Sequence, residues 1–452
     1  MTIITILLGL LGLGVVVFFH ELGHFIMARA MGVEVDEFSL GWGPKLAGFT
    51  RGRTTYRISA LPIGGYCRMK GEESYKKAIE EGLDDFPRER GSYFGAPPLK
   101  RIAIALGGPL MNIVFAFAVF AAVNGAGYEV RSWGTRVVLA SDFEPGAFAA
   151  DAAGLRTGDE LISVNGRALR SFADIQEAIA LSADRELVIE LERDGQRQSL
   201  VARPALDRES GAGRLGIYPW IDPRVASVKP GSAAALAGLQ AGDRIVAADG
   251  RPVRHGVELA RYIEERRPSR LLLSYERGGR VDETSLILSY PQDGQAETGI
   301  AWELTRYTVR SEGFIGALAD GYKTTSTAVV GTYRGLASLF RGVEVLKAVS
   351  GPARITWAVG QVATDGFSGG MAAGLTVSFN FLAILSIGLF VMNLLPIPLL
   401  DGGWIVLFVI EALRGKAAKV KTVLRYQTVG FVAIAGLFLL TTLADILFFS
   451  GR

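Results

Sequence analysis

Cysteine and histidine are nearly absent from the 452-residue sequence, which holds one cysteine and three histidines. The single Cys67 excludes an intrachain disulfide and any metal site built from paired cysteines. A zinc ion would therefore have to be held by histidine and carboxylate side chains. The formal net charge is only +3 and no basic patch with interleaved aromatic residues occurs, so nucleic acid is not an expected partner.

Long apolar runs are present instead. Hydrophobic residues make up 49% of the chain while charged residues still reach 21%, which indicates membrane spans joined to soluble domains. Four runs are long enough to cross a bilayer as helices. The first run is not preceded by a basic segment, so it does not have the form of a typical cleaved signal peptide.

Lysine and arginine cluster in two of the loops between these runs, at 29–101 and 404–427. Basic loops remain on the cytoplasmic side of a membrane. We therefore expect both loops to be cytoplasmic, and the long segment from 125 to 373 to lie outside together with the two chain ends.

The pattern His20-Glu21-Leu22-Gly23-His24 stands near the cytoplasmic end of the first run. Positions four apart lie on one face of a helix, so His20 and His24 can present ring nitrogens to one metal ion. Glu21 can then reach water at the metal and act as its general base. The alternative is two core histidines satisfied by hydrogen bonds. A metal site is favoured, because an ionisable residue in a span costs about 2.5–3.5 kcal/mol and is functional by default.

A catalytic zinc site usually has three protein ligands and one open position. The remaining histidine, His255, falls in the external segment and is expected to be a surface residue. Two aspartates lie at membrane depth, Asp401 and Asp445. Prolines and glycines interrupt the third span at Asp401, and the freed backbone must face protein or water. Asp445 falls near the outer end of the fourth span, so Asp401 is predicted to be the third ligand.

The first loop has a strand-like stretch from Arg53 to Leu61, and the segment from Tyr66 to Met69 is expected to pair back on it as a hairpin. An edge of this sheet, at Tyr56 and Ile58, is predicted to bind an extended substrate by strand addition. The alternative is a small cytoplasmic sheet without a ligand.

The external segment contains two copies of the pattern Ala-Gly-Leu-x-x-Gly-Asp, 84 residues apart, which is the size of a small domain. The copies resemble circularly permuted bacterial PDZ domains. In such domains a peptide adds as a strand beside a helix while a backbone loop binds its terminal carboxylate. Gly216 and Ile217 are predicted to form that loop in the second copy. A rigid spacer that binds nothing is the alternative.

The sequence therefore predicts a polytopic α-helical membrane protein with four transmembrane helices, two external α+β PDZ domains and a small membrane-associated β-hairpin region. In chain order we expect a first transmembrane helix at 1–28, the β region at 29–101, a second transmembrane helix at 102–124, PDZ domains at 127–212 and 213–306, amphipathic helices at 312–370, a third transmembrane helix with the Asp401 motif at 375–403, a basic loop at 404–427 and a fourth transmembrane helix at 428–449.

Taken in order, these motifs resemble the site-two protease family of intramembrane zinc metalloproteases, and within it the bacterial regulator-of-sigma-E type. The matching stretches are His20–His24, Phe38–Pro44, Gly64–Tyr66, Gly108–Asn112 and Asn393–Gly403. The resemblance implies His20, His24 and Asp401 as zinc ligands and Glu21 as catalytic base. It also implies that Asn393 hydrogen-bonds the substrate backbone. Many relatives carry a polar residue where this chain has Gly388.

The resemblance implies cleavage in the transmembrane segment of single-span membrane proteins, such as an anti-sigma factor or a remnant signal peptide, after a first external cut. The resemblance thus implies a role in regulated intramembrane proteolysis during a stress response. The implied location is the bacterial inner membrane, with the PDZ domains and both termini in the periplasm. Two other functions remain open. One is a membrane adaptor whose PDZ domains capture peptide C-termini beside a vestigial metal motif, and the other is a zinc protease with a cytosolic site.

Overall fold

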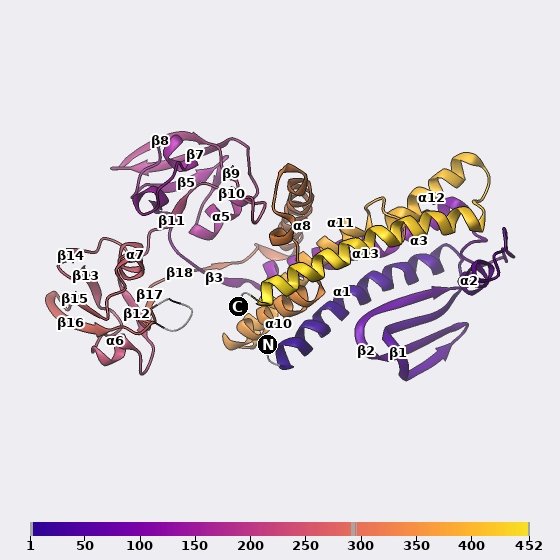
Figure 1. The fold of residues 1–452 in the computed structure, drawn as a ribbon, viewed down its shortest axis with the longest axis horizontal. Coiled ribbons are helices and arrows are strands. Elements are labelled where there is room, and N and C mark those ends of the chain that lie inside the picture. Colours follow the sequence, from indigo (N-terminus) through magenta and orange to yellow (C-terminus); the bar gives the residue numbers. More distant parts are fainter. Residues whose placement is uncertain (1–2, 291–293, 295, 451–452) are drawn as a thin grey trace. The chain divides into compact units, whose positions relative to one another are not determined.

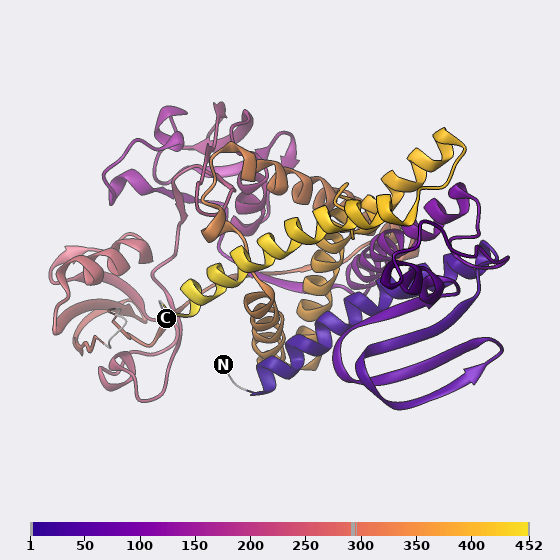
Figure 2. The same ribbon diagram turned by 45° about the vertical axis from the view of Figure 1, so that its right-hand side comes forward.

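The computed structural model describes residues 3–290, 294 and 296–450. The extreme chain ends and four positions of the expected second PDZ domain, 291–293 and 295, lie outside the described residues. The chain forms two compact units (Figures 1 and 2), one of Met1–Tyr128 with Val309–Arg452 and the other of Glu129–Thr308.

The first unit is mainly helical. Its elements are α1 (Ile3–Ala30), β1 (Val35–Arg51), β2 (Thr54–Met69), α2 (Glu72–Glu80), α3 (Pro98–Ala126), α8 (Gly313–Ser338), a 3₁₀ turn (Leu339–Arg341), α9 (Val345–Ala348), α10 (Pro352–Ser368), α11 (Met371–Asn393), α12 (Asp401–Arg414) and α13 (Val420–Ser450). Within the described residues, four helices are long and apolar enough to cross a membrane, namely α1, α3, α11 and α13. The four predicted spans correspond to these helices.

Helix α12 occupies the beginning of the segment that was expected to be a basic loop. The stretch from Trp404 to Leu413 holds neither proline nor glycine, and its side chains Leu407, Phe408 and Glu411 fall on one buried face. This spacing is that of an amphipathic helix. The polar loop expected from residue 404 is therefore limited to the residues between α12 and α13.

Helix α3 is the centre of the first unit, because it packs against α1, α8, α11 and α12. Its contact with α1 depends on a pair of glycines. A Cβ atom added at Gly23 would lie 2.1 Å from the Gly107 carbonyl oxygen, and one added at Gly107 would lie 2.6 Å from the Gly23 carbonyl oxygen. Small residues allow two membrane helices to approach backbone to backbone, and here they hold α1 directly against α3.

The long hairpin of β1 and β2 lies beside α1 (Figures 1 and 2). Its pairing differs from the expected one. Tyr56 pairs with Phe38 on one side and with Phe49 on the other, whereas the segment from Gly65 to Met69 pairs with the beginning of β1. The predicted pairing of residues 66–69 with 53–61 was wrong, because β1 supplies the partner for both. A segment paired on both edges has no free backbone groups for another strand.

The second unit consists of two similar copies. Its elements are β3 (Tyr128–Ser132), β4 (Val137–Leu139), a 3₁₀ turn (Ala140–Asp142), α4 (Ala149–Ala152), β5 (Glu160–Val164), β6 (Arg167–Ala168), α5 (Phe172–Ala180), β7 (Leu187–Arg193), β8 (Gln196–Ala202), β9 (Ala205–Leu206), β10 (Gly213–Arg214), β11 (Ile217–Pro219), β12 (Val225–Val228), α6 (Ala233–Leu236), β13 (Arg244–Ala248), β14 (Arg251–Pro252), α7 (Gly256–Arg266), β15 (Arg270–Arg277), β16 (Arg280–Ile287), β17 (Ile300–Trp302) and β18 (Thr305–Val309).

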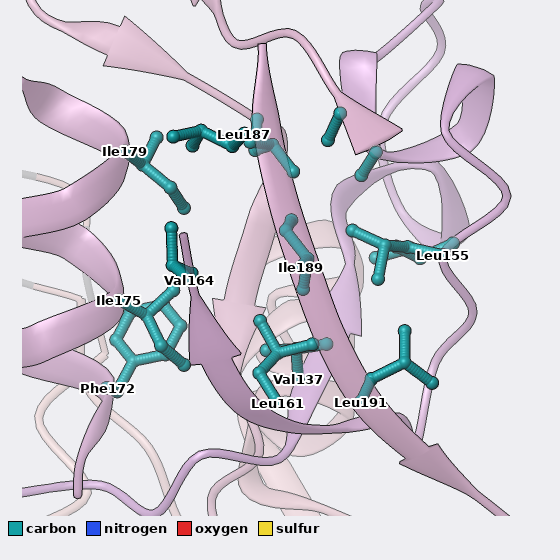
Figure 3. Close-up of a cluster of buried hydrophobic side chains, with 14 residues drawn as sticks. Val137, Leu155, Leu161, Val164, Phe172, Ile175, Ile179, Leu187, Ile189 and Leu191 are labelled. Atoms are coloured by element: carbon teal, nitrogen blue, oxygen red, sulfur yellow. The ribbon is translucent and has the colours of Figure 1, made fainter. Parts of the chain in front are cut away.

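Each copy is built on a four-stranded sheet, in the order β6-β5-β7-β8 in the first copy and β14-β13-β15-β16 in the second. Alternate residues of β7 are buried, as expected for a strand with one face on a core. In the first copy, side chains from β5 and β7 meet those of helix α5 (Figure 3), including Leu161, Ile175 and Ile189. The repeated sequence pattern thus specifies the same small domain twice.

The Gly-Asp step of the repeat has a structural role in both copies. Asp159 accepts hydrogen bonds from Arg193, and the equivalent Asp243 accepts them from Arg277 at 2.6 and 2.7 Å. Burial opposes ionisation of Asp243, but the hydrogen bonds from Arg277 and from the Gln240 backbone hold the pKa of this carboxyl below its usual value. The aspartate therefore joins its turn to the neighbouring strand as a buried anion.

The loop that was predicted to bind a carboxylate in the second copy is part of the first copy. Leu215 and Ile217 pack in the core of the first copy, and Ile217 pairs with Leu139. The equivalent loop of the second copy is the stretch from Thr298 to Ile300, whose Thr298 carbonyl accepts from Ala234 as that of Leu215 accepts from Ala150. The domain boundary predicted at 212/213 was too early, because a permuted copy takes its last strand from beyond the repeated pattern.

Candidate active site

The structure brings His20, His24 and Asp401 together. The two Nε2 atoms of the histidines lie 3.2 Å apart. Asp401 Oδ2 lies 3.2 Å from His20 Nε2, and Asp401 Oδ1 lies 3.4 Å from His24 Nε2. Zinc bonds of about 2.0–2.1 Å in a tetrahedron separate neighbouring ligand atoms by roughly 3.3 Å. The two histidine nitrogens therefore have the separation of two ligands of one tetrahedral zinc ion, and the Asp401 carboxylate turns one oxygen toward each of them, although the three residues come from helices far apart in the sequence.

The second ring nitrogen of each histidine also has a partner. His24 Nδ1 lies 2.9 Å from the Ile104 carbonyl oxygen, so it donates its proton there and leaves Nε2 free to bind a metal. His20 Nδ1 faces the buried Asn112 amide at 3.1 Å. A metal on Nε2 leaves the proton on Nδ1, and the amide oxygen of Asn112, whose assignment is interchangeable with nitrogen, is then its acceptor. Helix α3 thus supports both histidines.

Backbone contacts place the ligands with little spare room. A Cβ atom at Gly108 would lie 2.3 Å from His24 Nε2 and 2.7 Å from His20 Cε1. Near the third ligand, Leu399 has a positive φ of 82°, which is rare for a bulky residue. It marks a strained turn two residues before Asp401. A Cβ at Gly402 would lie 2.3 Å from the Leu395 carbonyl oxygen. Glycine after Asp401 is therefore required for α12 to begin at this turn.

Glu21 lies beside these ligands, where its carboxylate accepts a hydrogen bond from the Cys67 backbone. The same stretch of β2 passes close to it, since a Cβ at Gly65 would lie 3.6 Å from Glu21 Cγ. Asn393 ends α11 with its amide nitrogen 3.5 Å from His20 Nε2. A base and an amide donor are thus within reach of any group held at the three ligand atoms.

The other predicted residues lie elsewhere. Tyr56 packs on Phe25 and Phe49, and Ile58 is half exposed in the same doubly paired segment, so strand addition at Tyr56 and Ile58 is excluded. Gly216 and Ile217 are in the second unit, in the loop described above. His255 is fully buried and accepts from the Glu258 backbone at the start of α7, so its expected surface position was wrong.

Asp445 has a structural role. Its carboxylate accepts hydrogen bonds from the backbone of Gly351, Ala353 and Arg354 at 2.8 to 3.1 Å. These are the free amide groups at the first turn of α10, where a negative charge is favourable. This carboxylate ties α13 to α10, which accounts for a charge at membrane depth without a metal.

The chain matches known proteases over most of its length. The model of peptidase family M50 matches residues 8–437 of the chain. A Treponema pallidum protein, named as a candidate zinc metalloprotease, is 38% identical over 450 residues, which cover 98% of this chain and 99% of that protein. The "Regulator of sigma-E protease RseP" of Salmonella typhimurium is 30% identical over 427 residues, which cover 90% of each.

Among solved structures, the PDZ domain of an SdrC-like protein from Listeria monocytogenes aligns with 19% of this chain and 90% of its own length. It is 25% identical, with a TM-score of 0.17.

Proposed function

The chain belongs to peptidase family M50 and is a zinc metalloendopeptidase, and on that premise we propose that it cuts single-span membrane proteins within their transmembrane segments. The observation that carries the proposal is the position of the ligand triad. His20 and His24 are on α1, and Asp401 begins α12 after a short turn that follows α11. Both α1 and α11 are long and apolar enough to cross a membrane. A peptide bond that reaches these atoms would be inside or next to the bilayer.

The residues of the site would have separate roles in peptide hydrolysis. His20, His24 and Asp401 would hold a zinc ion, which supplies the Lewis acidity that polarises a carbonyl and activates water. Glu21 accepts the proton of the attacking water and delivers it to the leaving amine. Asn393 donates its amide hydrogen to the substrate backbone and keeps the scissile carbonyl in place.

The substrate must be unwound, because a helix hides its carbonyl groups in internal hydrogen bonds. Strand addition offers the unwound backbone new partners. We assign this role to the segment of β2 from Gly65 to Met69, which among the described pairings is paired along one edge only, with the beginning of β1. This segment passes beside Glu21, unlike Tyr56 and Ile58. Glycine or proline in the substrate helix should favour cleavage because these residues weaken a helix.

The orientation and the selectivity of the enzyme follow from the charge pattern and the two copies. Basic residues in 29–101 and between α12 and α13 favour a cytoplasmic position for both loops. The protein would then be embedded in a bacterial inner membrane, with the PDZ copies and both termini in the periplasm.

The PDZ copies would select the substrate. The copies exclude substrates with large external domains, and their loops at Gly216 and Thr298 would bind peptide C-termini left by a first protease. An anti-sigma factor or a remnant signal peptide has the required form.

Co-expression with single-span membrane proteins tests the proposal. The native enzyme should shorten a substrate whose external domain has been removed, and Glu21→Gln should leave it intact. Glutamine keeps the size of the side chain but cannot accept a proton, so zinc content and membrane insertion should match those of the native protein. Cleavage near the native rate in Glu21→Gln would remove Glu21 from the role of base.

A further inference from the structure

A buried ion pair joins α3 to α12 away from the ligand atoms. Arg101 is 4% exposed and Glu411 is 5% exposed, and Arg101 Nη2 lies 2.6 Å from Glu411 Oε2. Arg101 also donates from Nε to the Ala96 carbonyl oxygen at 3.0 Å, and its guanidinium lies over the Phe408 ring. Glu411 Oε1 accepts from the Ala418 backbone at 2.7 Å. The pair therefore connects both helices with the loop before α3 and the loop after α12.

Stability alone is a weak reason for this pair. Removing two charges from water costs several kcal/mol for each ion, and apolar residues of similar volume are often as stable. Glu411 Oε2 has no further hydrogen-bond partner among the described residues, so its charge is compensated by Arg101 alone. What an ion pair adds and an apolar contact lacks is one defined register between two helices.

The two helices that the pair joins carry opposite halves of the metal centre. On α3, the stretch that begins at Arg101 continues to the Ile104 carbonyl, which holds His24, and to Asn112, which faces His20. On α12, Asp401 is the first residue. Glu411 lies ten residues later, about 15 Å along the helix axis at a rise of about 1.5 Å per residue. The register of α12 on α3 therefore sets the distance from the carboxylate to the imidazoles.

Helix α12 needs such a fixed point. It has 14 residues, too few to span a bilayer, so its axial position is not set by hydrophobic length. Its beginning is held by the hydrogen bond that Tyr426 Oη donates to the Gly403 carbonyl oxygen at 2.9 Å, and the ion pair of Glu411 with Arg101 fixes its other end on α3. Metal ligands tolerate deviations of only about 0.2 Å, whereas a slip of one residue along a helix is about 1.5 Å.

We propose that the Arg101–Glu411 ion pair is a positioning device that fixes the register of α12 on α3 and thereby presents Asp401 to His20 and His24. The pair touches neither substrate nor metal, and its effect passes through Asp401. This inference rests on the proposed zinc site. It predicts that the pair controls metal affinity separately from the stability of the fold.

The test uses the full-length protein in mild detergent. Zinc affinity is measured by competition with a chromogenic chelator, and the melting temperature of the metal-free protein is measured in parallel. Glu411→Gln leaves Arg101 without a charge partner and should weaken zinc binding at least about ten-fold, the lower end of the range for residues that support metal ligands. The double variant Arg101→Met with Glu411→Leu should melt near the native temperature and still bind zinc more weakly.

Asp445→Asn is the matched control, because it also weakens a nearly buried carboxylate that joins two helices, 4% exposed against 5% for Glu411. It should lower the melting temperature without changing zinc affinity. The inference is overturned if the apolar double variant binds zinc as tightly as the native protein, or if Asp445→Asn weakens zinc as much as Glu411→Gln. Retention of zinc by Asp401→Ala would instead refute the proposed ligand set, and with it the target of the positioning.

Discussion

Replacing Gly108 by alanine should disable the metal centre without disturbing α3, the helix to which Gly108 belongs. The new methyl group would lie 2.3 Å from His24 Nε2 and 2.7 Å from His20 Cε1, whereas ordinary contacts are 3.4–4 Å. The imidazole of His24 must therefore retreat by about 1 Å, several times the deviation of about 0.2 Å that a metal ligand tolerates. Because alanine favours helix over glycine, α3 itself should remain intact.

We expect Gly108→Ala to lower zinc affinity about 10- to 100-fold, the range for disturbed ligand support, and cleavage by about 100-fold or more, as a 1 Å misplacement costs. Zinc per protein after purification, together with cleavage of a single-span substrate, gives both numbers. Gly436→Ala is the control, since a Cβ on that glycine of α13 meets nothing within 4 Å. Native zinc content and cleavage in Gly108→Ala would refute the placement of the two histidines against α3.

Three further predictions concern the third ligand, the orientation and the external copies. Asp401→Asn should lose zinc nearly as completely as Asp401→Ala, because a neutral amide oxygen is a poorer ligand, while Asp445→Ala should keep zinc near the native content; the reverse result would identify the wrong carboxylate. A reporter fused within 72–90 should be cytoplasmic and one fused between the PDZ copies periplasmic, and the opposite pattern would overturn the proposed filter. Deleting residues 128–305 should preserve the chemistry but admit substrates with folded external domains, whereas unchanged selectivity would show that the copies do not filter.

The sequence was most informative where a local pattern alone determines the structure. Apolar runs longer than a bilayer predicted the four helices that are long and apolar enough to cross a membrane, and the spacing of His20 and His24 put both on one helix face. Asp401 could be selected over Asp445 because prolines and glycines surround only the former. The hydrogen bonds from the first turn of α10 supply Asp445 with the structural role that the sequence left open.

Pairings between distant segments were not predictable in the same way. The sequence did not predict strand β1, because Gly41, Gly43 and Gly48 interrupt its apolar pattern. Without β1, Tyr56 was assigned to an edge of the sheet, although β1 pairs with it on both sides. The Arg101–Glu411 pair joins positions with no pattern in common. A supporting role for Asn112 could have been inferred from the sequence, because a polar amide inside an apolar span needs a partner. Its partner, His20, could not be inferred, because it depends on how α3 packs on α1.

The position of the cut in a single-span substrate tests the central claim most directly. Mass spectrometry of the fragments released by native enzyme, with Glu21→Gln as the blank, locates the new chain ends. The proposed function predicts ends within or immediately beside the transmembrane segment of the substrate, and none with the variant. Cuts confined to a soluble domain of the substrate, or the same ends produced by Glu21→Gln, would contradict it.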